Sequence, residues 1–255
     1  MNEQSVSLLG VRINPLTIPE LNARVAAVVE EGGKRVIANY NLHALYLYYH
    51  DAMMRKFFAS VDCAHIDGMS LVFLGRLLGL PLSRAQRVTY VDWVGPLMAE
   101  AARQGWRIFY LGSRPGVADK GAEKLRATYP SLNIQTSHGY FDIRPGSAEN
   151  AAVIKRIDAF RPHVLLVGMG MPRQEYWVLE NIEHLDCKAI LTAGACMDFV
   201  AGAIPTPPRW MGRCGLEWLY RLFSDPARLW RRYLLEPWFV LRLVWAEWRG
   251  RGLRP

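Results

Sequence analysis

Short apolar runs alternate with amphipathic helical patterns from residue 5 to about residue 200, and this alternation constrains the fold more than any other feature. Short apolar runs bounded by turn residues predict buried strands, and the segments between them predict helices. A repeated strand-helix-strand order predicts an α/β fold with a doubly wound, mostly parallel sheet. The runs that we expect to be strands are VSLLGVRI, RVIANY, CAHID, RVTYV, WRIFYLG, NIQTSHGYF, HVLLVGM and KAILTAG.

The pattern changes near residue 209, where the strand-like runs end and three helical segments follow. Pro226 and Pro237 begin the second and third segments, in the first helical turn where proline is tolerated. We therefore expect an α/β core over residues 1–208 and a helical appendage over residues 209–255.

The appendage carries most of the net charge. It holds ten arginines and four acidic residues, which give six of the eight net positive charges, and it also holds six of the nine tryptophans. Arginine and tryptophan on amphipathic helices are typical of contact with an anionic membrane surface. A basic helix that docks on its own domain has the same composition, so both interpretations stay open.

Cysteine spacing and apolar run length indicate where the protein works. The four cysteines (Cys63, Cys187, Cys196 and Cys214) form no Cys-x-x-Cys pair, which argues against a disulfide framework and suits a reducing cytoplasm. The first residues lack the pattern of a signal peptide, and no apolar run reaches the roughly 18 residues of a membrane-spanning helix. We expect a cytoplasmic protein, soluble or peripheral to a membrane.

Small and polar residues recur where the predicted strands end. They are Asn39, Asn41, Asp67, Gly112 and Gly168. Ligands of parallel α/β sheets bind at the carboxyl ends of the strands, so these positions are candidates for a site. An aspartate at a strand-to-helix junction, such as Asp67, is either a helix cap or a functional carboxylate.

Three glycine-containing turns join a predicted strand to a predicted helix. They are YLGSRPGVADK with Gly112, LLVGMGMPRQEYW with Gly168 and Gly170, and ILTAGACMDFVAG with Gly194. Backbone amides at such a turn favour an anionic ligand, although none of the three is a complete dinucleotide or Walker motif. Asp198, just beyond Gly194, either holds a ribose or base or caps the next segment.

Metal-binding motifs do not occur in the sequence: there is no Asp-x-Asp pair and no His-Glu-x-x-His. Metal-dependent nucleotide-sugar enzymes use such carboxylates to hold the cation of the diphosphate. Arginine can neutralise the same charge, because its guanidinium binds phosphate in a bidentate manner. We expect neither a metal ion nor another cofactor.

Seven segments resemble, in order, the sequence blocks of the WecG/TagA/CpsF glycosyltransferases (family 26) over residues 5–240. They are NYNLHAL, HIDGMSLVFLGRLLG, YLGSRPGVADKGAEKL, GYF, VGMGMPRQEYW, TAGACMDFVAG and RWMGRCGLEWLYRLFSDPARLWRRYL. The resemblance implies a Rossmann-like core and an inverting, metal-independent transfer of a sugar from a UDP-sugar to a polyprenyl-diphosphate-linked acceptor. It places this reaction in bacterial exopolysaccharide, common-antigen or teichoic-acid synthesis. It also implies an appendage that closes the site and contacts the inner face of the cytoplasmic membrane.

The resemblance also implies roles for particular residues. Asp67 matches the family's proposed general base, which favours the functional interpretation over the helix cap. Asn41 and Gln174 match polar residues of the pocket. The appendage residues Arg221, Arg228 and Arg231 match those thought to reach the diphosphate.

Further candidates carry less information. Asn39 stands where many relatives have threonine, which leaves its role open. His43 is either a second acid–base group or a structural residue at a helix start. We also expect Tyr140 and Glu175 to bind the UDP-sugar, together with Gly112, Gly168, Gly170, Gln174, Gly194 and Asp198.

Two other functions fit parts of the sequence. A Rossmann-type oxidoreductase would need a Gly-x-Gly-x-x-Gly followed about 20 residues later by an acidic ribose partner, and the chain has none. A non-enzymatic module that binds membranes or nucleic acid through the appendage leaves the polar strand ends without a role. We therefore expect a UDP-sugar glycosyltransferase that binds no nucleic acid. The sequence indicates neither the sugar nor whether the chain forms a homo-oligomer.

Overall fold

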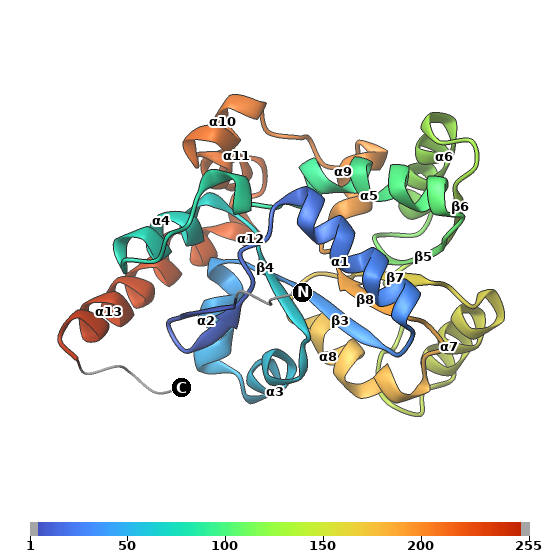
Figure 1. The fold of residues 1–255 in the computed structure, drawn as a ribbon, viewed down its shortest axis with the longest axis horizontal. Helices are drawn as coiled ribbons and strands as arrows, with labels where there is room; N and C mark the ends of the chain where they lie inside the picture. The colour runs from blue at the N-terminus through green and yellow to red at the C-terminus, as the bar shows by residue number, and fades with distance from the viewer. Residues whose placement is uncertain (1–4, 251–255) are drawn as a thin grey trace.

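Residues 5–250 are described by the computed structural model, apart from the side chains of Arg209, Arg213 and Arg228. A six-stranded sheet with the order β4-β3-β8-β7-β5-β6 forms its centre (Figure 1). All its strand pairs are parallel, which confirms the predicted doubly wound α/β fold. The strands are β3 (Arg35–Tyr40), β4 (Cys63–Ile66), β5 (Arg107–Gly112), β6 (Asn133–Ser137), β7 (Val164–Gly168) and β8 (Ala189–Thr192).

Helices cover both faces of the sheet. One layer contains α1 (Ile18–Glu31), α5 (Tyr90–Gln104), α6 (Val117–Thr128) and α9 (Cys196–Ala201). The other contains α2 (Leu42–His50), α3 (Ala52–Ser60), α4 (Met69–Leu77), α7 (Ala148–Phe160) and α8 (Arg173–Asn181). Short 3-10 turns, η1 (Arg84–Gln86) and η2 (Ile182–His184), follow α4 and α8.

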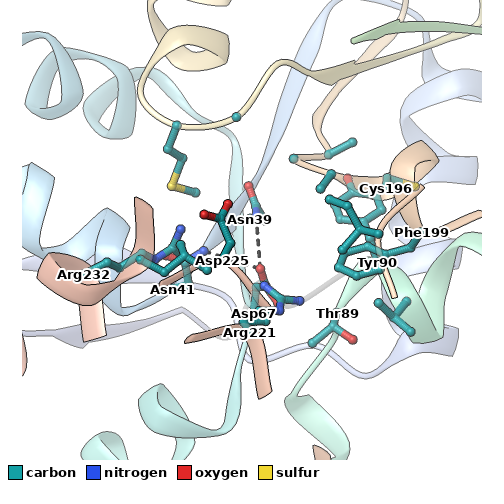
Figure 2. A pocket seen from close by; sticks show the side chains of 18 of the residues that line it. Asn39, Asn41, Asp67, Thr89, Tyr90, Cys196, Phe199, Arg221, Asp225 and Arg232 are labelled. Atoms are coloured by element: carbon teal, nitrogen blue, oxygen red, sulfur yellow. Dashed lines mark hydrogen bonds between the residues drawn. The ribbon is translucent and has the colours of Figure 1, made fainter. Parts of the chain in front are cut away.

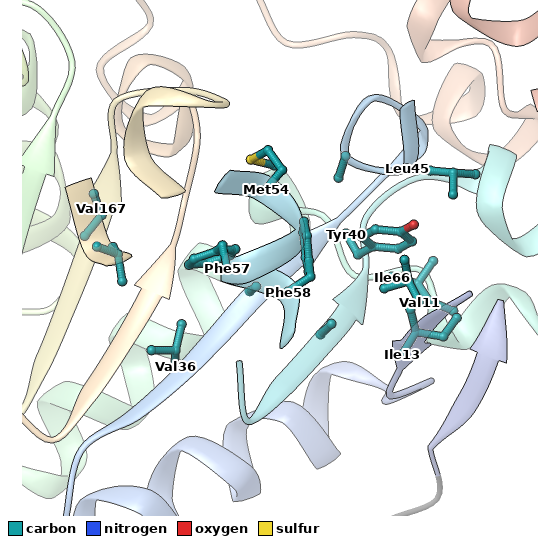
Figure 3. Close-up of a cluster of buried hydrophobic side chains, with 14 of the residues drawn as sticks. Val11, Ile13, Val36, Tyr40, Leu45, Met54, Phe57, Phe58, Ile66 and Val167 are labelled. Carbon is teal, nitrogen blue, oxygen red and sulfur yellow. The ribbon is translucent and has the colours of Figure 1, made fainter. Parts of the chain in front are cut away.

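Side chains of each strand divide between two hydrophobic clusters. On β5, Phe109 and Leu111 join one cluster, and Ile108 and Tyr110 join the other. This division follows from the alternation of side chains along a strand, and both clusters are buried because helices lie on both faces. Figure 3 shows part of the first cluster, where aromatic side chains of α3 pack against β3 and β4.

Two of the predicted strands are wrong. VSLLGVRI is a hairpin of β1 (Val6–Leu8) and β2 (Val11–Ile13), because Leu9 and Gly10 turn the chain with φ of 48° and 80°. RVTYV does not join the sheet. Its Thr89 is the N-cap of α5, so the helix begins within the apolar run.

The appendage consists of consecutive helical pieces. They are α10 (Arg209–Cys214), α11 (Glu217–Ser224), α12 (Pro226–Trp230), the π-helical turn η3 (Arg231–Leu235) and α13 (Glu236–Trp248). In η3 the amide of Glu236 donates to the carbonyl of Arg231, five residues earlier. Pro237 has no amide hydrogen, and its ring would clash with a carbonyl four residues earlier in a regular α-helix. Proline therefore explains why the helix widens here.

Apolar packing and ion pairs join the appendage to the core. Val240, Leu243 and Val244 of α13 belong to the first hydrophobic cluster. The Nδ1 atom of His43 lies 2.9 Å from the carboxylate of Glu236, and Arg87 forms an ion pair with Glu217. A division into two domains at residue 208 stays a prediction. Within residues 5–250, no helix is both long and apolar enough to cross a membrane.

Candidate active site

A cavity of about 200 Å³ lies at the carboxyl ends of β3, β4, β7 and β8. Residues after these strands form its base, and residues of α11, α12 and η3 line its other side. Figure 2 shows that side chains from the two parts of the chain point into the same space. The cavity therefore has the position at which ligands bind in parallel α/β sheets.

Asp67 lines this cavity directly after β4, and two asparagines hold one of its carboxylate oxygens. The Nδ2 atoms of Asn39 and Asn41 lie 3.2 Å and 3.5 Å from Asp67 Oδ2. Within the described part of the chain, Asp67 Oδ1 has no hydrogen-bond donor from a side chain. The carboxylate is thus oriented by two amides and keeps one oxygen for a ligand.

The two asparagines are themselves fixed by their side-chain oxygens. Asn39 Oδ1 accepts from the hydroxyl of Thr192 at 2.8 Å, and Asn41 Oδ1 accepts from the amide of Ala44 at 3.0 Å as the N-cap of α2. With the oxygens engaged, the NH₂ groups turn towards Asp67. Asp67 does not cap α4, because Gly68 is the N-cap and no side-chain cap bond forms there.

His65, two residues before Asp67, is not suited to acid–base catalysis. It is fully buried on β4, in contact with the rings of Tyr90 and Trp93. Burial lowers the pKa of His65 to about 4, against an opposing effect of the Asp67 charge. The imidazole is therefore neutral at physiological pH, and of these two residues it is Asp67 that lines the cavity.

Gln174 forms hydrogen bonds with two backbone amides, those of Gly170 and Gly194, that we expected to bind a phosphate. Its Oε1 atom accepts from the backbone amides of Gly170 and Gly194, each at 3.1 Å, and its Nε2 atom donates to Glu175 at 2.8 Å. Gln174 thereby connects the turn after β7 to the turn after β8. Both of these turns line the cavity.

Glu175 lies behind this bridge and does not line the cavity. It is fully buried, and its second carboxylate oxygen has no partner among the described residues. Burial raises the pKa of Glu175 to about 7, although the hydrogen bond from Gln174 opposes the shift. Its observed contact is the hydrogen bond from Gln174, and it does not reach the cavity.

Gly112 and Gly168 lie where neighbouring strands approach closely, outside the cavity lining. A side chain on Gly112 would clash with the backbone of Gly168, and one on Gly168 would clash with Tyr110. Asp198 accepts from Ser113 Oγ at 2.7 Å, and Ser113 lies 3.1 Å from the hydroxyl of Tyr110. These residues are thus bonded to one another near the strand ends.

The remaining predicted residues separate into two groups. Arg221 lines the cavity, stacked over Phe199 at 5.3 Å, and its buried Nε has no partner among the described residues. Tyr140, His43 and Arg231 do not line it: Tyr140 is 64% exposed, His43 pairs with Glu236, and Arg231 is exposed beside Trp230. The side chain of Arg228 lies outside the described residues.

Arg232 lines the cavity in place of the predicted Arg231. Burial lowers the pKa of Arg232, and the neighbouring Arg221 lowers it further, while Tyr233, Glu236 and Asp67 raise it. A cation in this position is favoured by an anionic ligand. Other lining residues that sequence reasoning missed are Thr89, Tyr90, Phe199, Tyr220, Asp225 and Tyr233.

The missed aromatic residues left little signal in the sequence. Tyr90 lies in a run that we assigned to a strand, and Tyr220 follows the tryptophan of an amphipathic helix. Only the folding of α11 and η3 over the strand ends brings them together. Among residues 5–250, no cluster of three or more His, Cys, Asp or Glu side chains could hold a metal ion.

Comparison with known proteins agrees with this geometry. The model of the "Glycosyl transferase WecG/TagA/CpsF family" matches residues 6–253. The chain belongs to this family. It is a glycosyltransferase, as the resemblance of its motifs implied.

Similar proteins include two staphylococcal enzymes, each named N-acetylglucosaminyldiphosphoundecaprenol N-acetyl-beta-D-mannosaminyltransferase. The enzyme from Staphylococcus aureus (strain MRSA252) is 29% identical over 181 residues, and that from strain MW2 is 28% identical over 181 residues. In both cases the match covers 71% of this chain and 68% of the relative. The matched length includes most of the core described above.

Proposed function

We propose that this glycosyltransferase moves a sugar from a UDP-sugar to a polyprenyl-diphosphate-linked acceptor, with inversion at the anomeric carbon. The observation that carries the proposal is one oriented carboxylate, Asp67, in a cavity that two arginines of the appendage also line. The names of the staphylococcal relatives support an acceptor of this kind, because they contain a diphosphoundecaprenol-linked sugar.

Asp67 acts as the general base in this proposal. Its free Oδ1 atom takes the proton of the acceptor hydroxyl while the hydroxyl oxygen attacks the anomeric carbon. The bond from that carbon to the diphosphate oxygen breaks, and its electron pair leaves with UDP. A single displacement of this type inverts the configuration, and the amides of Asn39 and Asn41 hold Asp67 in place for it.

Arg221 and Arg232 stabilise the departing diphosphate. Negative charge develops on its oxygens as the bond breaks, and guanidinium groups that already face this position stabilise it. The unpartnered Nε of Arg221 and the partial burial of Arg232 support this role, because both cations gain from an anionic ligand. Of the two other arginines that we predicted for the same task, Arg231 does not line the cavity, and the side chain of Arg228 lies outside the described residues.

The acceptor enters from a membrane, and the appendage supplies the contact. Trp238, Trp245 and Trp248 of α13 are exposed by 69%, 55% and 61%, although their neighbours Val240 and Val244 are buried. The apolar exposed face lies among arginines, which suits an anionic lipid surface. We infer a peripheral protein on the inner face of the cytoplasmic membrane.

The donor is the least defined part of this proposal, and a direct screen tests it. The purified protein would be incubated with a polyprenyl-diphosphate-linked N-acetylglucosamine and, in turn, four donors. These are UDP-glucose, UDP-N-acetylmannosamine, UDP-N-acetylmannosaminuronate and UDP-glucuronate. Release of UDP with formation of a disaccharide lipid for one donor supports the function, and a folded protein that transfers sugar from none of the four donors refutes it.

Chelation tests whether arginines, and not a cation, neutralise the leaving group. We expect transfer to be unchanged in excess EDTA, because two guanidinium groups already face the cavity. The assay would compare initial rates with and without EDTA, and then with added Mg²⁺ or Mn²⁺. Activity that disappears with EDTA and returns with either cation would refute the metal-independent mechanism.

A further inference from the structure

Helix α4 places apolar side chains on the surface of the core. Phe73 and Leu77 are 45% and 53% exposed, whereas Leu71, Val72 and Leu74 of the same helix are buried. In the described core up to residue 208, Tyr140 is the one other large apolar side chain exposed to this extent. Apolar exposure in the core is thus concentrated on one face of the helix that directly follows Asp67.

Positive charge accompanies this apolar face. Residues 68–91 contain three arginines and no acidic residue. Arg87 is engaged with Asp92 and Glu217, but Arg76 and Arg84 have no ion pair with another described side chain and are exposed. A surface of exposed phenylalanine, leucine and arginine is complementary to an anionic bilayer, because acyl chains receive the apolar groups and head groups receive the charges.

This face of α4 adjoins the appendage. Gly215, which ends α10, lies against Phe73 and Met69, where an added Cβ would be 3.1 Å from the Phe73 ring. In Figure 1, α4 and α13 both extend from the sheet towards the same end of the molecule. The exposed stripe of α13 (Trp238, Leu241, Trp245 and Trp248) therefore has a counterpart in the core.

We propose that residues 68–86, comprising α4 and the loop through η1, form a second membrane-binding element that enters an anionic bilayer beside the appendage. This inference rests on the proposed function, since it assumes that the appendage binds a membrane. Two weak anchors give stable attachment where one does not, and two contacts also fix the protein's orientation.

The connection to Asp67 gives this element a role in catalysis. Asp67 and α4 are separated by Gly68 alone, so contact of α4 with the bilayer holds the general base close to the head-group region. A lipid-linked acceptor then presents its sugar hydroxyl to Asp67 without the polyprenyl chain leaving the membrane. The element would position the active site and would not touch the reacting atoms.

Fluorescent labelling at single cysteines tests the proposal directly. Cys214 is exposed and the other three cysteines are buried, so Cys214→Ser gives a background for labelling with an environment-sensitive dye. Leu77→Cys would report on α4, Trp245→Cys on the appendage, and Lys120→Cys on the distant α6. The labelled proteins would be mixed with vesicles of phosphatidylcholine and phosphatidylglycerol, and with vesicles of phosphatidylcholine alone.

The emission changes at positions 77, 245 and 120 distinguish the possible outcomes. We expect blue-shifted, roughly twofold stronger emission at positions 77 and 245 on anionic vesicles, and none at position 120. A shift at position 245 alone would overturn the proposal and leave the appendage as the sole anchor. No shift at either position would overturn the membrane contact in the proposed function as well.

Charge variants provide a second, independent measurement. Arg76→Gln with Arg84→Gln should weaken co-sedimentation with anionic vesicles by about tenfold, because each arginine near the surface contributes to binding. Lys120→Gln with Lys155→Gln removes the same charge from α6 and α7 and should leave binding unchanged. Transfer to a short-chain, water-soluble acceptor should persist in both variants. Equal binding by the two variants would refute a specific contact at α4.

Discussion

The strand ends and the appendage line one cavity, but they present their polar groups in opposite ways. At the strand ends, core residues hold the asparagine and glutamine side chains: Gln174 Oε1 accepts hydrogen bonds from two backbone amides, and Asn39 accepts from Thr192 and donates to Asp67. In the appendage, Arg221 has a buried Nε with no partner in the described chain. The core therefore holds a fixed geometry, whereas the appendage brings cations whose partner has to come from outside.

Substitution of Asp67 should have the largest effect on the core's side of this comparison. Asp67→Asn keeps the shape of the side chain and removes its basicity, so kcat should fall by roughly 10²–10⁴ while donor affinity changes little. Steady-state kinetics and binding of UDP would be measured on the same preparation. Near-normal kcat would remove Asp67 from the chemistry and leave it a structural residue.

The adjacent pair Arg232 and Arg231 tests the appendage's side. Arg232→Ala removes a cation that lines the cavity, so kcat should fall by roughly 10². Arg231→Ala removes an equal charge from the exposed side of the same turn and is the matched control, with an expected change below about threefold.

Vesicle binding separates the two roles of these arginines. Both variants should still co-sediment with anionic vesicles, because the other arginines of the appendage remain. Equal loss of kcat in both variants would mean that charge acts through membrane attachment and not at the diphosphate.

The smallest expected effect concerns stability, and it originates at Glu175, a buried carboxyl that does not line the cavity. Because the pKa of Glu175 rises to about 7 on folding, its neutral form is favoured in the native state. The shift therefore changes the free energy of unfolding with pH. Its stabilising contribution, roughly 3 kcal/mol at most, is fully present below the ordinary pKa near 4.5 and is lost as the pH rises through 7.

Urea unfolding of the wild type and of Glu175→Gln between pH 5 and pH 8 would measure this contribution. The difference in unfolding free energy between the two proteins should favour the wild type at pH 5 and shrink, or reverse, by pH 8. A difference that stays constant with pH would show that Glu175 does not change its protonation in this range.

The fold was predictable where the local apolar pattern determines the secondary structure. Alternating runs predicted the parallel sheet, and Asn39, Asn41 and Asp67 were recognisable because they follow strands that end at one edge. The run VSLLGVRI was misread because a hairpin needs only two residues, Leu9 and Gly10, with positive φ. A short turn of this kind leaves no break in the apolar pattern.

The site was predictable in part, and the failures share one cause. Glycine turns suggested free amides, but the side chain that occupies the amides of Gly170 and Gly194 comes from Gln174, which sequence reasoning placed on the ligand's side. Likewise, Tyr233 enters the site only through the path of the appendage across the sheet. Such contacts depend on the tertiary fold, and the spacing of residues in the sequence does not predict them.

We infer that the widened turn before Pro237 helps to select which arginine faces the cavity. An α-helix advances by about 100° per residue, so a turn that holds one extra residue rotates all that precedes it by about that angle. Arg231 and Arg232 are adjacent in the sequence and have the same side chain. A rotation of this size therefore changes which of the two side chains points into the cavity. Two related chains can share every arginine in an alignment and still aim different ones at the diphosphate, if only one of them has the proline.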